Sequence, residues 1–554
     1  MKEGFRQSMA WLHTWSGLLV GWVLFLVFAG GTAAYFRSEI TFWAKPELHA
    51  AARHPVPADE ALRHAIAHLQ AHGAQSERWF ITLPTEREPG VRMFWQGPPP
   101  KTEPGQKPPR RRFLNATLDP ASGQPLADAR ETRGGEFFYR LHFDLHYMPA
   151  LWARWIVGFC AMFMLTAIVS GIVTHRRIFK DFFTFRPKKG QRSWLDAHNA
   201  TAVLALPYHL MITYTGLVTL MFMYMPWAGQ AAYKDHGGQQ AMFGEVFNSV
   251  QGRDAKAAGQ RAAMVDFAPL MAQASAQWQG APVGRVVVNL PNDVNASVSF
   301  ERKEGRDLSS EQPTVRFNAV TGERVASTLD QAPQAALETR GVLYGLHIAR
   351  FSNPLLRGLF FLSGLAGCVM VATGLLLWAV KERQKYAKVL KHGGRIGLGL
   401  RLVDGLNVAT IAGLPIAFAS FLWANRLVPV GIAQRPAVEI QCFFIAWAVA
   451  AVLGLLWPTR RMWQLQLGVG ALLFAGVPLV NAVATPGSSL AVTMPAGLWP
   501  VAGLDLMCVG LGAALALAAW YVRPKSKAAA RPAAKAAASP APPVGRPVAG
   551  EGAP

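Results

Sequence analysis

Cysteine is scarce in this sequence, and several common motifs are missing. The four cysteines among 554 residues form no C-x-x-C pair. A C-x-x-C-H segment is therefore absent, which excludes covalent c-type haem attachment through that motif. The chain also lacks H-E-x-x-H and G-x-x-x-x-G-K-[ST]. These absences argue against a zinc protease of that type and against a P-loop ATP site.

Acidic residues are outnumbered, with 33 Asp and Glu against 55 Lys and Arg and a formal net charge of +22. Segments 176–192 and 381–401 each carry seven basic residues and one acidic residue. The short loops 426–437 and 486–497 hold only two basic residues between them. Basic loops at alternate helix ends are the positive-inside pattern of a membrane protein. This placement predicts cytoplasmic termini and no nucleic-acid partner.

Charged residues are absent from long apolar runs, for example from Leu18 to Tyr35. Such a run is long enough to cross a hydrocarbon core of ~30 Å as a helix. The sequence therefore predicts a lipid bilayer as partner and an all-α transmembrane bundle of about eight helices. The runs lie at about 18–35, 155–174, 200–225, 358–380, 406–425, 438–457, 464–485 and 498–522.

Two of these runs carry a histidine at the same depth. A shift of 185 residues places His13 on His198 and Gly31 on Gly216. An ionisable side chain inside a membrane helix indicates a functional site. Neutral imidazole is a common protein ligand of b-type haem iron. The pattern predicts that His13 and His198 hold a haem b near the cytoplasmic face.

A second set of histidines lies where the chain re-enters the membrane from outside. His347 is predicted to hold a second haem b, together with either His142 or His146. The latter two stand at i and i+4, which would place them on one helix face. His209, near mid-membrane, is a further candidate cofactor ligand or proton-relay group. His175 is interpreted as a boundary residue near lipid phosphates.

The outer segments repeat one pattern of helix and strands. A helical spacing of apolar residues begins at Asp59, and strands are expected at 79–84 and 91–95. The second copy has a helix at 264–278 and a strand at 286–291. A shift of 203 places Gly171 on Gly374 in the helices that follow. The first 385 residues thus form one duplicated unit of helix, outer domain and helix.

These features resemble the PepSY-associated transmembrane family of bacterial inner-membrane proteins. The matching segments are H-T-W-S-G at 13–17, Y-R-L-H at 139–142, D-A-H-N at 196–199 and Y-G-L-H at 344–347. The outer segments, with their D-E-A-L helix and D-P-A-S-G turn, resemble PepSY domains. The resemblance implies two small α+β periplasmic domains and an inner-membrane location.

Some members of that family are di-haem reductases of ferric siderophores. The resemblance therefore implies two haems b per chain and reduction of a periplasmic ferric siderophore or other ferric chelate in iron uptake. The electron donor would be a quinol or a cytoplasmic reductase. Arginines near the outer histidines would pair with haem propionates, attract an anionic chelate or simply form an ordinary basic helix end, and Asp144 would orient an imidazole or remain solvated. Those arginines are Arg140, Arg154, Arg350 and Arg357.

Two other functions are compatible with the same residues. A non-enzymatic protein could bind a periplasmic partner through the PepSY-like domains, with structural histidines. A transporter component would use residues 403–522 as its pathway, but that part holds only three acids at or within its spans and no histidine. A coupled transporter usually needs more buried charge.

The predicted organisation has ten parts. They are 1–36 (terminus and first span), 37–150 (outer domain 1), 151–175 (span), 176–195 (basic loop), 196–225 (span), 226–354 (outer domain 2), 355–380 (span), 381–402 (basic loop), 403–522 (four-helix membrane module) and 523–554 (disordered tail).

Overall fold

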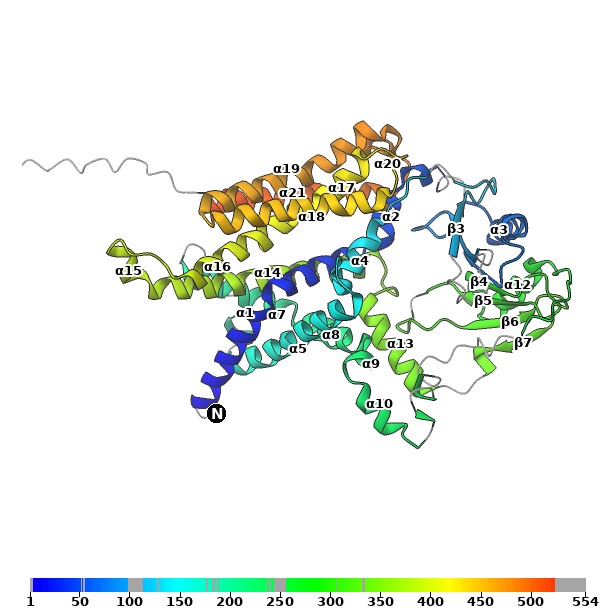
Figure 1. Ribbon diagram of the computed structural model, residues 1–554, viewed down its shortest axis with the longest axis horizontal. Helices are drawn as coiled ribbons and strands as arrows, with labels where there is room; N and C mark the ends of the chain where they lie inside the picture. Colours follow the sequence, from blue (N-terminus) through cyan, green and yellow to red (C-terminus); the bar gives the residue numbers. More distant parts are fainter. Residues whose placement is uncertain are drawn as a thin grey trace, which may run out of the picture.

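A computed structural model describes most of the chain. The described residues are 3–50, 52, 55–97, 113–126, 129–175, 178–181, 184, 186, 189–235, 237–238, 241–243, 256–305, 307–330 and 334–523. The tail after Arg523 and parts of the basic loop 176–195 lie outside this range. Figure 1 shows a helical bundle with a β-sheet domain at one end.

The bundle is built from long apolar helices. Seven described helices are long and apolar enough to cross a membrane, and a bent pair adds an eighth span if it is taken as one. The predicted bundle is therefore present. The seven are α1 (Glu3–Ala34), α5 (Ala150–Thr174), α14 (Pro354–Lys385), the continuous α16 (Leu398–Asn407), η4 (Val408–Ala412) and α17 (Gly413–Leu427), then α18 (Arg435–Leu456), α19 (Arg460–Ala484) and α21 (Trp499–Val522).

The third predicted span is broken rather than straight. Helix α7 (Gln191–Leu204) and helix α8 (Leu206–Thr219) meet at an angle of 68° around Ala205. Pro207 explains the break, because it has no N–H to donate and its ring clashes with the carbonyl four residues earlier. Because of the bend, His198 on α7 and His209 on α8 lie on helices that run in different directions.

The two outer segments form one sheet rather than two separate sheets. Seven antiparallel strands run in the order β3-β2-β1-β4-β5-β6-β7, and β1 of the first segment pairs with β4 of the second, with Phe80 opposite Val287. Helices α3 and α12 pack on the sheet over a shared core. The bounds are α3 (Ala58–His72), β1 (Arg78–Thr82), β2 (Val91–Gln96), β3 (Phe113–Leu118), α12 (Phe267–Gln277), β4 (Val283–Asn289), β5 (Ser297–Arg302), β6 (Thr314–Asn318) and β7 (Arg324–Ser327).

The shared core predicts that damage in one segment spreads to the other. Phe300 is fully buried in β5, so Phe300→Ala should destabilise the domain by about 3–5 kcal/mol. Faster hydrogen exchange is then expected in β1 and β2 as well as in β5. The control is Val325→Ala, because Val325 is exposed on β7. Exchange confined to the second segment would show that the two segments fold independently.

Two helices connect the sheet domain to the bundle. Helix α4 (Gly134–Asp144) follows the first outer segment, and helix α13 (Ala335–Ile348) follows the second. Helix α2 (Arg37–Trp43) extends α1 outward and packs beside α4. The remaining short helices are η1 (Pro46–Leu48), α6 (Ile178–Asp181), α9 (Met221–Tyr224), α10 (Pro226–Ala232), η3 (Thr328–Asp330), α15 (Ala387–Lys391), η5 (Pro486–Ser488) and α20 (Leu490–Thr493).

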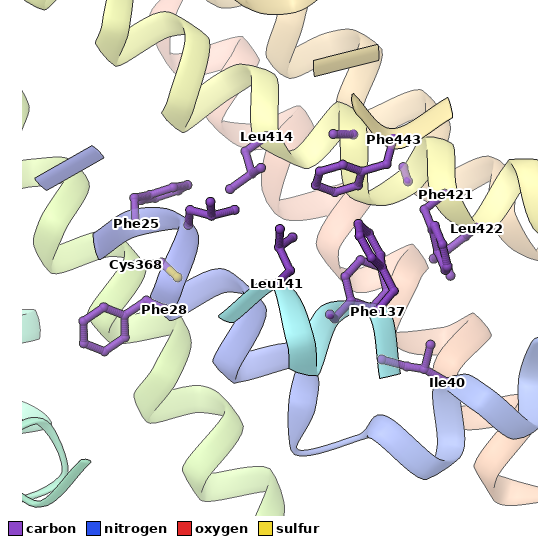
Figure 2. Packing of buried hydrophobic residues seen from close by; sticks show 14 of the residues in the cluster. Phe25, Phe28, Ile40, Phe137, Leu141, Cys368, Leu414, Phe421, Leu422 and Phe443 are labelled. Carbon is purple, nitrogen blue, oxygen red and sulfur yellow. The ribbon is translucent and has the colours of Figure 1, made fainter. Parts of the chain in front are cut away.

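Helices α16 to α21, here called the C-terminal module, pack along the first helices of the chain. One continuous apolar core joins them to α1, α2 and α4. In Figure 2, Phe137 and Leu141 of α4 point toward Leu414, Phe421 and Phe443 of the module. The module is thus continuous with the duplicated part of the protein.

Candidate functional site

The first candidate centre joins α1 and α7. The ring centres of His13 and His198 are 6.1 Å apart, although the residues are 185 positions apart in sequence. His13 Nδ1 bonds to the carbonyl oxygen of Ala167 at 2.8 Å, and His198 Nδ1 bonds to that of Met370 at 2.9 Å. The structure therefore brings together the two histidines that the repeat aligned.

The second candidate centre joins α4 and α13. The ring centres of His142 and His347 are 6.0 Å apart. His142 Nδ1 bonds to the carbonyl oxygen of Val27 at 2.6 Å, and His347 Nδ1 is 3.1 Å from Thr215 Oγ1. The ring separation matches that of the first centre, whereas the interplanar angle is 37° here and 68° there.

These hydrogen bonds fix the tautomer of the four neutral imidazoles. A carbonyl oxygen can only accept, so Nδ1 carries the proton in His13, His142 and His198. Thr215 Oγ1 already donates to the Met211 carbonyl oxygen at 2.7 Å, so it accepts the Nδ1 proton of His347. Nε2 then bears the free lone pair in each ring. Metal-ligating histidines have this arrangement, in which the other nitrogen is oriented by a hydrogen bond.

A glycine makes room for each of the four rings. A Cβ added at Gly171 would lie 3.1 Å from Cε1 of His13, and one at Gly374 would lie 3.2 Å from Cε1 of His198. A Cβ at Gly31 would lie 2.8 Å from Cε1 of His142. The corresponding distance from Gly216 to Cε1 of His347 is 3.0 Å. The sequence shifts already aligned these four glycines with one another. They did not reveal that each glycine makes room for a histidine ring.

The spacing of the rings suits one metal ion between each pair. A metal–imidazole bond of about 2 Å places two ring centres about 6 Å apart when both Nε2 atoms face one ion. Within the described residues, no group of three or more His, Cys, Asp or Glu stands together as a metal site. Two axial imidazoles are the protein ligands of a bis-histidine haem, whose macrocycle supplies the other four nitrogens.

His146 does not share a helix face with His142, contrary to the expectation from their spacing. Helix α4 ends at Asp144, and Leu145, His146 and Tyr147 have φ angles of 52°, 56° and 49°. This left-handed backbone turns His146 away from the centre. Its ring stacks on Phe444 at 5.5 Å instead. Of the two alternatives, the structure places His142 beside His347.

The other two histidines stand apart from these pairs. His209 is buried on α8, and its ring interacts with the backbone at Ala202 and Ser363. Its ring contacts Phe28 at 5.9 Å and Tyr208 at 5.7 Å. His175 caps the end of α5. The role of His209 as a ligand or relay group stays a prediction.

A large cavity reaches the outer pair from the sheet domain. Its volume is about 1440 Å³, and its walls include both imidazoles, the glycines beside them and residues of β5 and β6. Typical pockets for small molecules occupy ~300–1000 Å³, so this one is larger than a typical small-molecule pocket. The cavity thus connects membrane depth at Leu24 and Met164 with the outer sheet.

Arginines line the cavity, and each has a carboxylate partner. Arg154 contacts Asp144 at 2.8 Å, Arg357 contacts Glu39 at 3.0 Å, and Arg350 pairs with Glu304. Arg140 is exposed and bonds to Glu136 and Asp144 instead of lining the cavity. Asp144 therefore binds arginines and does not orient His142. Arg37 and Arg87, which the sequence reasoning missed, also line the cavity.

Two tyrosines lie one turn before the outer histidines. Tyr139 and Tyr344 form a side-chain hydrogen bond between the two repeats, and both line the cavity. Arg37 lies over the Tyr139 ring at 4.6 Å. Burial, followed by the contact with Tyr344, raises the pKa of Tyr139 to about 12. This tyrosine therefore remains a neutral hydrogen-bonding phenol at neutral pH.

Comparison with known proteins identifies the family to which the duplicated unit belongs. Residues 10–381 match the model of the PepSY-associated TM region. The chain belongs to the PepSY-associated transmembrane family. It is also 26% identical over 384 residues to the uncharacterized protein PA4219 of Pseudomonas aeruginosa, an alignment that covers 66% of this chain and 90% of that protein.

The family region includes both histidine pairs and all four glycines beside them. It ends before α16, so the C-terminal module lies outside it. Family membership therefore covers the two centres and gives no account of the module. The absence of histidine from residues 403–522, noted in the sequence, agrees with a module that adds no imidazole to either centre.

Proposed function

We propose that this protein is an inner-membrane electron-transfer protein that holds two haems b and reduces ferric chelates in the periplasm. The observation that carries the proposal is the pair of matched centres, with ring separations of 6.1 and 6.0 Å and an oriented Nδ1 on every imidazole. His13 and His198 would hold one haem, and His142 and His347 the other. Bound haem would supply a one-electron redox centre at each position.

The depth of the centres supports transfer across the membrane. His13 lies on α1, and the same helix supplies Gly31, which contacts His142. The 18 residues between them correspond to about 27 Å along the helix axis. One centre near each face suits a path from a donor inside, a quinol or a cytoplasmic reductase, to an acceptor outside. By the positive-inside rule the basic loops 176–192 and 381–401 would face the cytoplasm, which supports this orientation.

The outer cavity would hold the ferric chelate. Ferric siderophores and other ferric chelates often carry negative charge, and the arginines of the cavity provide charge-assisted donors. Tyr139 and Tyr344 present phenol groups that can bond to chelate oxygens. Addition of one electron converts Fe(III) to Fe(II), which binds hard oxygen ligands more weakly. Iron would then leave the chelate on the periplasmic side.

Anaerobic electron counting tests this function. The haem-loaded protein is reduced, freed of excess reductant and mixed with ferric citrate, an anionic ferric chelate, and an Fe(II)-trapping dye. We expect reoxidation of the haem and formation of Fe(II) in equal electron numbers. A His142→Ala variant serves as the matched control and should yield little Fe(II). If ferricyanide reoxidises the protein while ferric chelates do not, the acceptor assignment is wrong.

A further inference from the structure

A polar network between the duplicated unit and the C-terminal module supports helix α4. The network joins the segment before α4 to the C-terminal module. Thr132 Oγ1 donates to Glu439 Oε2 at 2.5 Å, and Arg435 Nη1 donates to the Glu131 carbonyl oxygen at 3.0 Å. Arg130 Nη1 donates to the Asn425 carbonyl oxygen at 2.9 Å. Three consecutive residues before α4 are thus bonded to the module.

The module side of this network is fully buried. Arg435 and Glu439 form an ion pair with side-chain exposures of 1% and 0%. Asn425 Nδ2 also donates to Glu439 at 2.8 Å. Buried ion pairs of this kind add little net stability, because desolvation offsets their attraction. Their retention is better explained by the geometry that they impose on the groups they bind.

A second polar connection fixes α2, the helix beside α4. Trp43 Nε1 donates to Asp505 Oδ1 at 2.8 Å, and Arg426 Nη2 donates to the Trp43 carbonyl oxygen at 2.6 Å. The Arg426 guanidinium also lies over the Trp43 ring at 3.6 Å. Asp505 is held in turn by Asn481. The module therefore forms hydrogen bonds both to α2 and to the segment that precedes α4.

Aromatic packing continues this contact along α4 itself. Phe138 stacks on Phe418 with ring centres 4.6 Å apart and an interplanar angle of 8°. Phe137 stacks on Phe421 at 4.9 Å and meets Phe443 edge-on at 5.0 Å. Figure 2 shows Phe137 beside Phe421 and Phe443. His142 follows about one turn later on the same helix.

The equivalent helix of the second repeat is supported differently. Helix α13 packs on α8 and on the loop around Leu308, where Ser310 N donates to the Gly341 carbonyl oxygen at 2.9 Å. The carbonyl oxygen of Leu308 lies so close to Gly345 that a Cβ there would clash. The two halves of the outer centre therefore differ in what supports their helices.

We propose that the C-terminal module positions α4 and thereby sets the placement of the His142 imidazole opposite His347. The module acts through α4 and contacts neither imidazole as a ligand. The effect of this positioning on a haem centre rests on the function proposed above. The positioning of α4 by the module does not depend on that function. This assigns a function to residues 398–522, which lie beyond the family region.

The first test replaces both members of the buried pair, in the full-length Arg435→Met and Glu439→Met double variant. Two apolar side chains of similar length leave no uncompensated charge, so the module should still fold. The contacts to Glu131 and Thr132 are lost. We expect amides of α4 to exchange at least about tenfold faster with solvent, while those of α13 keep their wild-type rate.

A second variant and a control separate positioning from general damage. Phe138→Ala removes the stacking contact from the α4 side and should also accelerate exchange in α4. Leu472→Ala lies in the same module on α19, where Leu472 is exposed, and should leave α4 unchanged. Equal acceleration in α4 and α13, or none in either helix, would overturn the proposal.

Redox titration gives the second readout in haem-loaded protein. The double variant should shift the midpoint potential and low-spin spectrum of one haem and leave the other as in the wild type. Two unchanged potentials would show that the network does not set the outer centre. If the wild type binds no haem while the double variant still loosens α4 alone, the proposed redox function fails and the positioning of α4 stands.

Discussion

His347→Ala is expected to lower the haem b content from two per chain to one. The variant removes one of the two Nε2 lone pairs of the outer centre, while His13 and His198 keep their hydrogen bonds and their 6.1 Å spacing. Loss of a residue that merely orients a ligand costs about 10–100-fold in affinity or activity, so loss of a ligand should cost more. Ferric-chelate reduction should therefore fall by more than about 100-fold.

The measurement is a pyridine haemochrome count with a reduced-minus-oxidised spectrum of the purified variant. His198→Ala should leave one haem as well, with the spectral signature of the outer centre. His392→Ala is the matched control, because His392 is exposed and its Nδ1 bonds to the carbonyl oxygen of Lys388. Two haems with a wild-type spectrum in His347→Ala would show that this residue is no ligand.

Gly216→Val is expected to mimic the loss of His347 without changing any histidine. Its Cβ would stand 3.0 Å from His347 Cε1, and the two methyl groups would occupy the space of the ring. Close-packed interiors do not absorb such a change without displacing a neighbour. The imidazole should move out of ligand geometry, and the outer haem should be lost.

Gly374→Val should act in the same way on His198 and the inner haem, so each glycine variant removes a different haem signal. Gly358→Val on α14 and Gly468→Val on α19 are the controls, since nothing lies within 4 Å of a Cβ at either position. Haem counts and low-spin spectra separate the four variants. A Gly216→Val protein that keeps both haems would contradict the close packing on which the two centres depend.

The membrane spans and the histidine pairs could be predicted because each depends on local or repeated information. An uncharged run of membrane length has few other stable environments. The shift of 185 residues aligned His13 with His198, and the structure places their rings together. Repeated sequence forms repeated structure, and the equivalent histidines of the two copies lie together in both pairs.

Choices that depend on backbone detail could not be predicted from spacing. His142 and His146 look equivalent as an i, i+4 pair, but α4 ends between them and three consecutive residues adopt positive φ. Such backbone costs about 1–2 kcal/mol per residue, and the packing of His146 and Tyr147 on Phe444 compensates for it. That compensation comes from a segment 300 residues away.

Contacts between segments that are distant in sequence could not be predicted either. The pairing of Phe80 with Val287 merges two outer segments into one sheet, and no local pattern specifies it. The C-terminal module lacks histidine, which correctly indicates that it supplies no imidazole to the centres. The same absence gave no indication of its contacts with α4. Those contacts involve Arg435 and Glu439, which in sequence look like ordinary helix-end charges.

Each histidine pair is proposed to hold one haem b. The most direct measurement is a pyridine haemochrome count on the purified wild-type protein, produced with ample haem and combined with a dithionite-reduced minus oxidised spectrum. Two haems b per chain, both low-spin and bis-histidine, are predicted. A protein that folds with both imidazole pairs intact and contains no haem would contradict the claim, and binding of a periplasmic partner would then become the leading function.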